Sequence, residues 1–199
     1  MFGLLRKNTE SPPARSGSGR DEAGDLRLIG QIVDGDRRAF ETLYRAYFSR
    51  LARFLDRMTH NTALIEEIIN DAMLVVWRRA DTFDHSCKLS TWIFSIAYRT
   101  ALKAIGHRDE PVDADPDLQH GDAMHEPEAG FIQQQLQQRV AQALGMLPLE
   151  QRMVVNLTYY HGMGYEEIAG IMECPVNTVK TRMFHARRRL KTLLADTAE

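Results

Sequence analysis

The densest group of side chains able to do chemistry lies near the C-terminus, between Val176 and Lys191. This stretch holds six Lys or Arg residues and no acidic residue. Its apolar positions recur every three or four residues, the spacing of one helix face; they are Val179, Met183, Ala186 and Leu190. A helix that is apolar along one face and cationic elsewhere has the size and charge to enter the major groove of DNA.

The polar side chains of this helix divide by position. We expect the following residues, on the outward face or beside it, to contact DNA: Asn177, Thr178, Lys180, Thr181, Arg182, Phe184, His185 and Arg188. Cations of the C-terminal half, Arg188 among them, suit phosphates, which position a protein without specifying sequence. A solvated basic face without a ligand is the alternative.

A second short helix is predicted just before the basic one. Tyr165–Met172 has helical spacing, and Glu173–Pro175 can form a tight turn between the two helices. A short helix, a tight turn and a cationic helix with a complete inward face together indicate a DNA-binding helix-turn-helix.

The rest of the chain also predicts helices, and no segment has the alternation of a strand. We expect four helices in a first body, at about 25–33, 36–58, 64–79 and 90–105, and four in a second, at about 131–147, 148–160, 165–172 and 176–191. Asp36 and Ser90 can act as N-caps, and Gly35 and Gly106 as stops. The predicted fold class is all-α, with two small helical domains joined by a flexible acidic linker.

The charge is unevenly distributed along the chain. Residues 109–130 contain eight acidic residues and no Lys or Arg, so the remainder carries a net +6 although the total is −2. This segment also holds Pro111, Pro116 and Pro127, and we expect an extended linker. Residues 1–24, rich in Ser, Pro, Gly and Arg, are predicted to be a disordered tail.

These motifs together resemble the sigma-70 family of RNA polymerase sigma factors, in its extracytoplasmic-function (ECF, group 4) branch. Region 4 of that family is matched by Leu147–Arg152, Tyr165–Ala169, Asn177–Arg182 and Ala186–Arg187. Region 2 is matched by Glu66–Asp71, Trp77–Arg78, Phe83 and Ser90–Ala97. The resemblance assigns region 2 to residues 25–108 and region 4 to residues 131–199.

The resemblance implies roles for residues of the first body. Binding to the polymerase core, through its β′ and β subunits, would use Glu67, Asn70, Asp71 and Arg78. Capture of a flipped base of the −10 promoter element would use Phe83, Asp84, His85, Ser86, Cys87, Lys88, Arg99 and Lys103. Phe83 could instead be plain core packing. The DNA-contacting residues of the second body would read the −35 element. The family also implies a cognate anti-sigma factor.

Two other functions remain open at this point. A stand-alone helix-turn-helix regulator would explain residues 148–191 but leave the first body without a role. A sigma mimic that sequesters an anti-sigma factor would not need the cationic helix. The chain has no phosphate-binding loop, metal-ligand spacing or nucleophile motif. We therefore expect no enzyme, catalytic residue, cofactor, metal or small-molecule substrate. We also expect no membrane insertion, and a cytoplasmic location.

Overall fold

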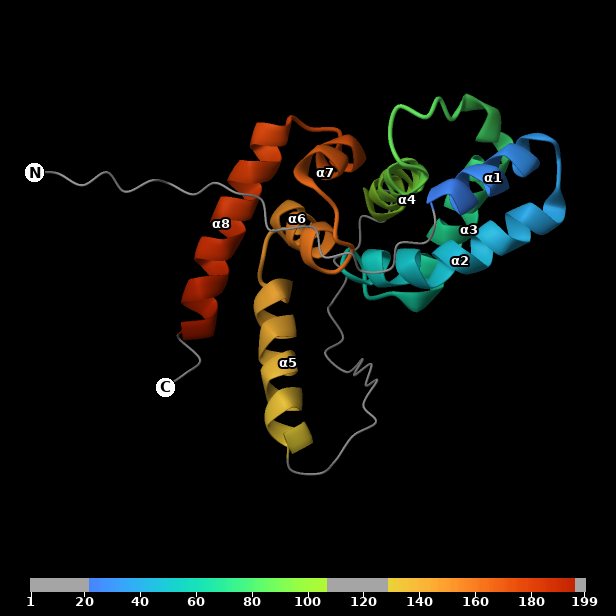
Figure 1. Ribbon diagram of the computed structural model, residues 1–199. Helices are drawn as coiled ribbons and strands as arrows, with labels where there is room; N and C mark the ends of the chain where they lie inside the picture. The colour runs from blue at the N-terminus through green and yellow to red at the C-terminus, as the bar shows by residue number, and fades with distance from the viewer. Residues whose placement is uncertain (1–21, 107–128, 196–199) are drawn as a thin grey trace, which may run out of the picture.

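Where the structure describes it, the chain folds into α-helices (Figure 1). The computed structural model describes residues 22–106 and 129–195, and these ranges contain no β-strand. The elements are α1 Glu22–Val33, α2 Arg37–Asp56, α3 Thr62–Arg78, the 3-10 turn η1 Ala80–Thr82, α4 Leu89–Gly106, α5 Ala129–Gly145, α6 Leu149–Tyr159, α7 Tyr165–Met172 and α8 Val176–Ala195. None of the helices in these ranges has the combined length and hydropathy that a membrane crossing requires.

Local capping sets several helix boundaries. The Asp36 carboxylate accepts hydrogen bonds from the backbone N–H groups of Arg38 and Ala39, as the predicted N-cap should. Gly35, at φ +86°, turns the chain between α1 and α2 in a conformation that favours glycine. Asn61 caps α3 by accepting from the N–H of Leu64 at 3.0 Å.

Three predicted boundaries are wrong by a few residues. α1 begins at Glu22, inside the predicted tail, because acidic residues in a first turn complement the helix dipole even where no apolar spacing marks the start. α4 begins at Leu89, so Ser90 lies within its first turn and is not its N-cap. α5 begins at Ala129 and not near 131. The rest of the predicted tail and linker, residues 1–21 and 107–128, lies outside the described residues.

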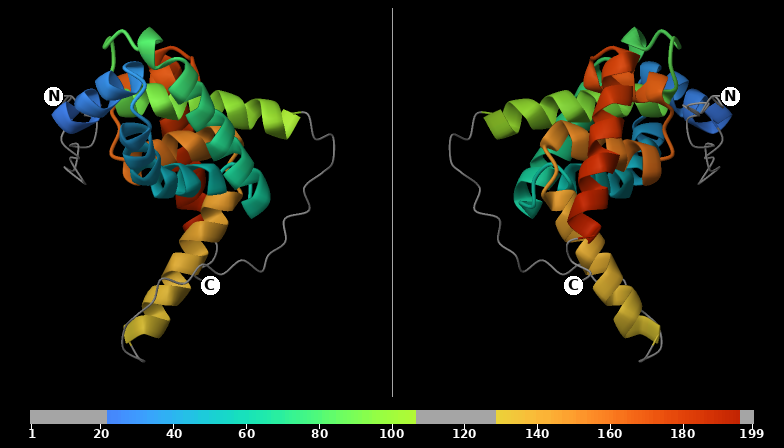
Figure 2. Two further views of the ribbon diagram at one scale, coloured as in Figure 1. Left: turned by 90° about the vertical axis from the view of Figure 1, so that its right-hand side faces the viewer. Right: turned by 90° about the vertical axis from the view of Figure 1, so that its left-hand side faces the viewer.

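The buried apolar side chains of the two bodies form one core cluster, to which each body contributes its inward helix faces. In the first, the inward faces of α2, α3 and α4 meet around Tyr47, Phe54, Ile69 and Phe94, which are all fully buried. In the second, α6, α7 and α8 enclose Met153, Ile168 and Val179. α5 packs against α8 and projects away from the other helices (Figure 2).

The two bodies also touch each other. α4 of the first body packs along α7 of the second, and Figure 1 shows these two helices as the closest elements between the halves. His161, in the turn between α6 and α7, lies against Phe94 and Phe54 of the first body, with ring centroids 4.9 and 6.1 Å apart. Two bodies were predicted from the sequence, but their direct contact was not.

Candidate nucleic-acid interface

The predicted helix-turn-helix is present in α7 and α8. Val179, Met183 and Ala186 of the predicted apolar face of α8 turn inward and are at most 2% exposed, whereas its fourth member, Leu190, is half-buried. Glu173 makes the sharp turn after α7 in a left-handed conformation, at φ +50°. The turn and the buried face fix α8 on the body with its opposite, cationic face toward solvent.

Most of the predicted −35 contact residues lie on that solvent face. Exposed side chains belong to Asn177, Lys180, Thr181, Phe184, His185 and Arg188, while Thr178 is half-buried. Phe184 is 63% exposed and packs edge-on against His185, with ring centroids 5.5 Å apart. An exposed aromatic ring among cations is a surface feature of nucleic-acid contacts and has no core-packing role here.

Arg182 differs from the other residues of this set. Its guanidinium lies 3.3 Å from the Glu150 carboxylate of α6 and donates to the Cys174 sulfur at 3.5 Å. Its side chain is only 23% exposed. Arg182 therefore ties α8 to α6 and to the turn, and it helps to hold α8 in place.

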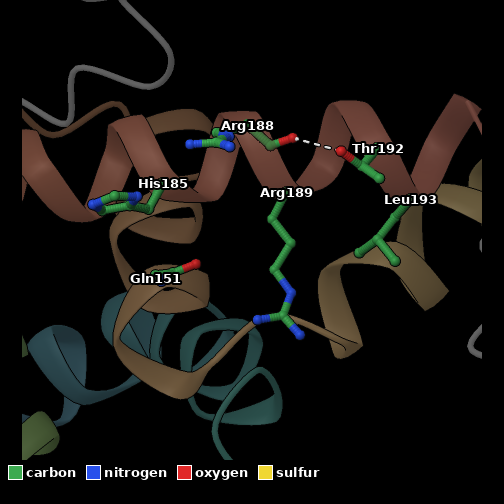
Figure 3. A pocket seen from close by; sticks show the side chains of 6 residues that line it. All are labelled: Gln151, His185, Arg188, Arg189, Thr192 and Leu193. Atoms are coloured by element: carbon green, nitrogen blue, oxygen red, sulfur yellow. Dashed lines mark hydrogen bonds between the residues drawn. The ribbon is translucent and has the colours of Figure 1, made fainter.

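A basic pocket lies between α6 and the C-terminal half of α8 (Figure 3). It is lined by Gln151, His185, Arg188, Arg189, Thr192 and Leu193. Figure 3 shows the Arg189 side chain extending from α8 toward the chain of α6, whereas Arg188 lies on the outer side of α8. The Arg189 guanidinium and the His185 imidazole at this hollow, with Arg188 on the outer side of the same helix, give a cationic surface that suits an anionic group such as a DNA phosphate.

The predicted −10 loop is exposed at its tip and anchored at its base. Asp84, His85, Ser86, Cys87 and Lys88 are all exposed. The Ser86 backbone N–H donates to the Asp84 carboxylate at 3.0 Å, and hydrogen bonds from Ser86 lower the pKa of that carboxyl. This local turn holds the loop in a defined shape.

Phe83 lies beneath the loop. Its ring is 7% exposed and packs against Trp92 and His85, at centroid distances of 5.4 and 4.7 Å. His85, at φ +60°, is held in a left-handed conformation that places its exposed ring over Phe83. Because the Phe83 ring is buried and the His85 ring is exposed, only the His85 imidazole is accessible to a nucleic-acid base.

The Cys87 thiol in this loop is poorly suited to nucleophilic or redox chemistry. Burial, together with the carboxylates of Asp84 and Glu167, raises its pKa. The reactive thiolate form is thus disfavoured. Nor do the described residues bring three His, Cys, Asp or Glu side chains together in a group that could hold a metal ion.

The remaining −10 candidates lie on or beside α4. Arg99 donates to the Glu173 carboxylate at 2.8 Å, and Lys88 lies 3.1 Å from that of Glu167. Both acids belong to the second body, so these two cations are paired across the contact between the bodies. Lys103 is exposed near the end of α4.

The predicted core-binding residues form one exposed face of α3. Glu67, Asn70, Asp71 and Arg78 are all exposed, and the Tyr44 hydroxyl donates to the Asn70 side chain at 2.8 Å. Sequence reasoning missed Leu74, which is 43% exposed in the middle of this face. The sequence did contain a signal: Leu74 follows Asp71 by three residues, so an apolar side chain shares the polar face of the helix.

Family models match both bodies of the chain. The model described as "Sigma-70 region 2" matches residues 43–110, and that described as "Sigma-70, region 4" matches residues 137–190. The chain is 31% identical over 180 residues to the ECF RNA polymerase sigma-E factor of Escherichia coli, a match that covers 85% of this chain and 94% of the relative. It is 30% identical to the RNA polymerase sigma-H factor of Pseudomonas aeruginosa, with coverage of 85% and 93%.

Two solved structures share this fold. The sigma factor RpoE from Bartonella quintana, solved with the anti-sigma factor NepR, superposes with a TM-score of 0.60 at 27% identity, over 78% of this chain and 96% of that one. CnrH, solved with the cytosolic domain of CnrY, has a TM-score of 0.65 at 24% identity and covers 88% of this chain and 99% of its own. The fold and both halves of the sequence thus define a two-domain transcription initiation factor. The chain belongs to the sigma-70 family, in its ECF group.

Proposed function

We propose that this sigma factor directs the RNA polymerase core to a specific set of promoters, with region 4 reading the −35 element and region 2 opening the −10 element. Region 2 would comprise residues 25–108 and region 4 residues 131–199. Because promoter recognition requires the polymerase and the chromosome, we propose that the protein acts in the cytoplasm. The outward face of α8 carries the proposal, because it offers cations, hydrogen-bonding groups and an exposed aromatic ring on a helix anchored by its opposite face.

Each proposed contact has a physical basis in the described residues. Side chains near the N-terminus of α8, Asn177, Lys180 and Thr181, can reach base edges, where a bidentate contact contributes about 1–3 kcal/mol of discrimination. The pocket beside Arg188 and Arg189 can take backbone phosphates. On α4 and its loop, His85 offers a ring for stacking, and Lys88, Arg99 and Lys103 offer positive charge for a single strand.

We also propose a cognate anti-sigma factor as a partner. The relative from Bartonella quintana was solved with such a protein, and this chain covers 96% of that relative. The proposed core-binding face of α3, Glu67 to Arg78, is accessible in the free chain. A partner that covered this face would block polymerase binding.

Run-off transcription tests the proposed function. Purified core polymerase, this protein and the DNA upstream of its own gene should give a transcript with a defined start only when the protein is present. Binding to that DNA without core, and no binding to core in a pull-down, would instead identify a stand-alone regulator. Core binding with no transcript from any upstream region of its genome would also contradict the proposal.

A further inference from the structure

Four arginines lie where the end of α2 meets α6. Arg50, Arg53 and Arg57 follow one another at three and four residues, so they share one face of α2 and its C-cap. Arg152 lies on α6. The Arg57 guanidinium is 5.5 Å from the centre of the Tyr160 ring at the C-terminal end of α6, and Figure 1 shows these two helix ends beside each other. We refer to the four arginines as the α2–α6 cation cluster.

No carboxylate of the described residues lies within ion-pair distance of this cluster. Asp56, next to Arg57 in the chain, lies 3.8 Å from His60 instead. Arg57 and Arg152 are both half-buried. Burial and the positive charge of Arg57 lower the pKa of the Arg152 guanidinium, so these two cations repel each other. Half-buried cations without an acid cost free energy, and an anion between them would recover it.

Polar atoms beside the cluster are also buried without a hydrogen-bond partner. They are Arg152 Nε, Asn156 Oδ1 and His161 Nε2. Asn156 is only 4% exposed and follows Arg152 by one helix turn, and His161 lies in the turn after α6. Because buried polar groups are nearly always paired in folded proteins, this group of atoms indicates a polar ligand. The guanidinium, the amide and the imidazole can all donate hydrogen bonds to an anion.

We propose that the α2–α6 cation cluster is a binding site for a small anion with two or more phosphate groups, such as inorganic triphosphate or the phosphate chain of a nucleotide. Arg57 and Arg152 would bind the phosphates directly, with the Asn156 amide as a further donor. Guanidinium groups suit this ligand because each can donate two parallel hydrogen bonds to phosphate oxygens. Four cations without an acid also favour a multiply charged anion over a single phosphate. The inference goes beyond the proposed function and does not depend on it, because none of these residues belongs to the proposed promoter-reading surfaces.

Calorimetric titration of the full-length chain with inorganic triphosphate, without polymerase or DNA, tests the site. We expect one triphosphate per chain, with an affinity about tenfold above that for inorganic phosphate. Arg152→Gln and Arg57→Gln should each weaken triphosphate binding about tenfold, as expected when a charge-assisted hydrogen bond is lost. The matched control is Arg37→Gln, which removes the same charge from an exposed position of α2 and should bind as wild type.

A variant that keeps the cluster folded guards against a purely structural effect. Asn156→Asp places a carboxylate one turn from Arg152, where it can pair with the cluster as the anion would. It should abolish triphosphate binding without lowering the melting temperature of the free chain. Triphosphate should raise the melting temperature of the wild-type chain and leave that of Asn156→Asp unchanged, because a ligand stabilises only the fold that binds it.

The other outcomes would overturn the site. Equal triphosphate binding by Arg152→Gln, Arg57→Gln and Arg37→Gln, or no saturable binding by the wild-type chain, would contradict it. Wild-type affinity in Asn156→Asp would also contradict it. If a single-stranded oligothymidylate bound and lost affinity in Arg152→Gln, while triphosphate did not bind at all, the cluster would be a nucleic-acid contact and the small-anion proposal would be wrong. None of these results bears on run-off transcription, so the proposed function stands or falls separately.

Discussion

At the scale of the residue, two arginines of α8 are expected to behave differently. Arg182 is tied to Glu150 and Cys174, whereas Arg188 is exposed beside the basic pocket. Arg182→Ala should lower the free energy of unfolding by about 0.5–1 kcal/mol, because it removes a partly buried ion pair and its packing. Urea denaturation followed by circular dichroism would measure this loss.

Arg188→Ala is the matched variant, at an exposed position of the same helix. It should leave the free energy of unfolding within about 0.5 kcal/mol of wild type. In holoenzyme it should reduce the slope of log promoter affinity against log salt concentration by about one, the signature of one lost phosphate contact. Arg182→Ala showing the larger salt effect would mean that its side chain leaves Glu150 to bind DNA.

At the scale of the element, the exposed face of α3 gives a prediction about polymerase binding. Leu74 lies among polar side chains on that face and is 43% exposed, so truncation costs little folding energy. Leu74→Ala should weaken binding to core about tenfold, or about 1.4 kcal/mol, if it is the apolar centre of the interface. Val33→Ala, at a 52% exposed position of α1, is the control and should bind as wild type. Affinities measured by fluorescence anisotropy would separate them.

The N-terminus of α7 depends on one carboxylate. The Glu167 side chain accepts from the Gly164 N–H at 2.9 Å, which satisfies one of the first backbone donors of this short helix. Glu167→Ala should therefore lower the free energy of unfolding by about 1 kcal/mol, the usual effect of a lost helix cap. Glu167→Gln retains an acceptor and should lose less than half of that in thermal unfolding. Equal losses would mean that the charge, through Lys88, matters more than the cap.

The elements differ in how far the sequence could predict them. Helix positions and inward faces followed from apolar spacing, and residues such as Ile69, Ile168 and Val179 are buried as predicted. The exposed residues of α8 followed from the same periodicity, because residues opposite a buried face must meet solvent. The inward tilt of Arg182 did not, because it depends on where α6 places Glu150 in space.

At the scale of the whole molecule, the contact between the bodies left no signal in the sequence. Thr91 on α4 lies more than 70 positions before Glu167 and Gly170 on α7, and small or charged residues of this kind are ordinary on any helix surface. Apolar periodicity identifies large buried faces but not the body against which each face packs; Phe94 of α4 contacts both Phe54 of its own body and His161 of the other. Only three-dimensional placement brings these groups together.

The contact between the two bodies should depend on pH, because His161 lies within it. Its ring packs against Phe54 and Phe94, and burial, with Arg50 and Arg53 of α2 nearby, lowers its pKa to about 4. When the bodies separate, the imidazole should regain its ordinary pKa of about 6.5. Since the open chain then binds the proton more tightly, acid favours opening between pH 6.5 and 4.

Closed chains, whose two bodies are in contact, should therefore become rarer relative to open chains, whose bodies are apart. The ratio of closed to open chains should fall about tenfold between pH 7.5 and 5.5, the change that linkage predicts for one group with these two pKa values. Energy transfer between dyes at Gln31→Cys on α1 and Ala195→Cys on α8, in a chain with both native cysteines replaced by serine, would report it. His161→Phe keeps an aromatic ring against Phe94 but cannot take a proton, so its closure should be constant over this range. If His161→Phe opened with acid as the parent chain does, another group would be responsible. A parent chain unchanged between the two pH values would mean that His161 stays exposed to water in solution and that the two bodies are already apart.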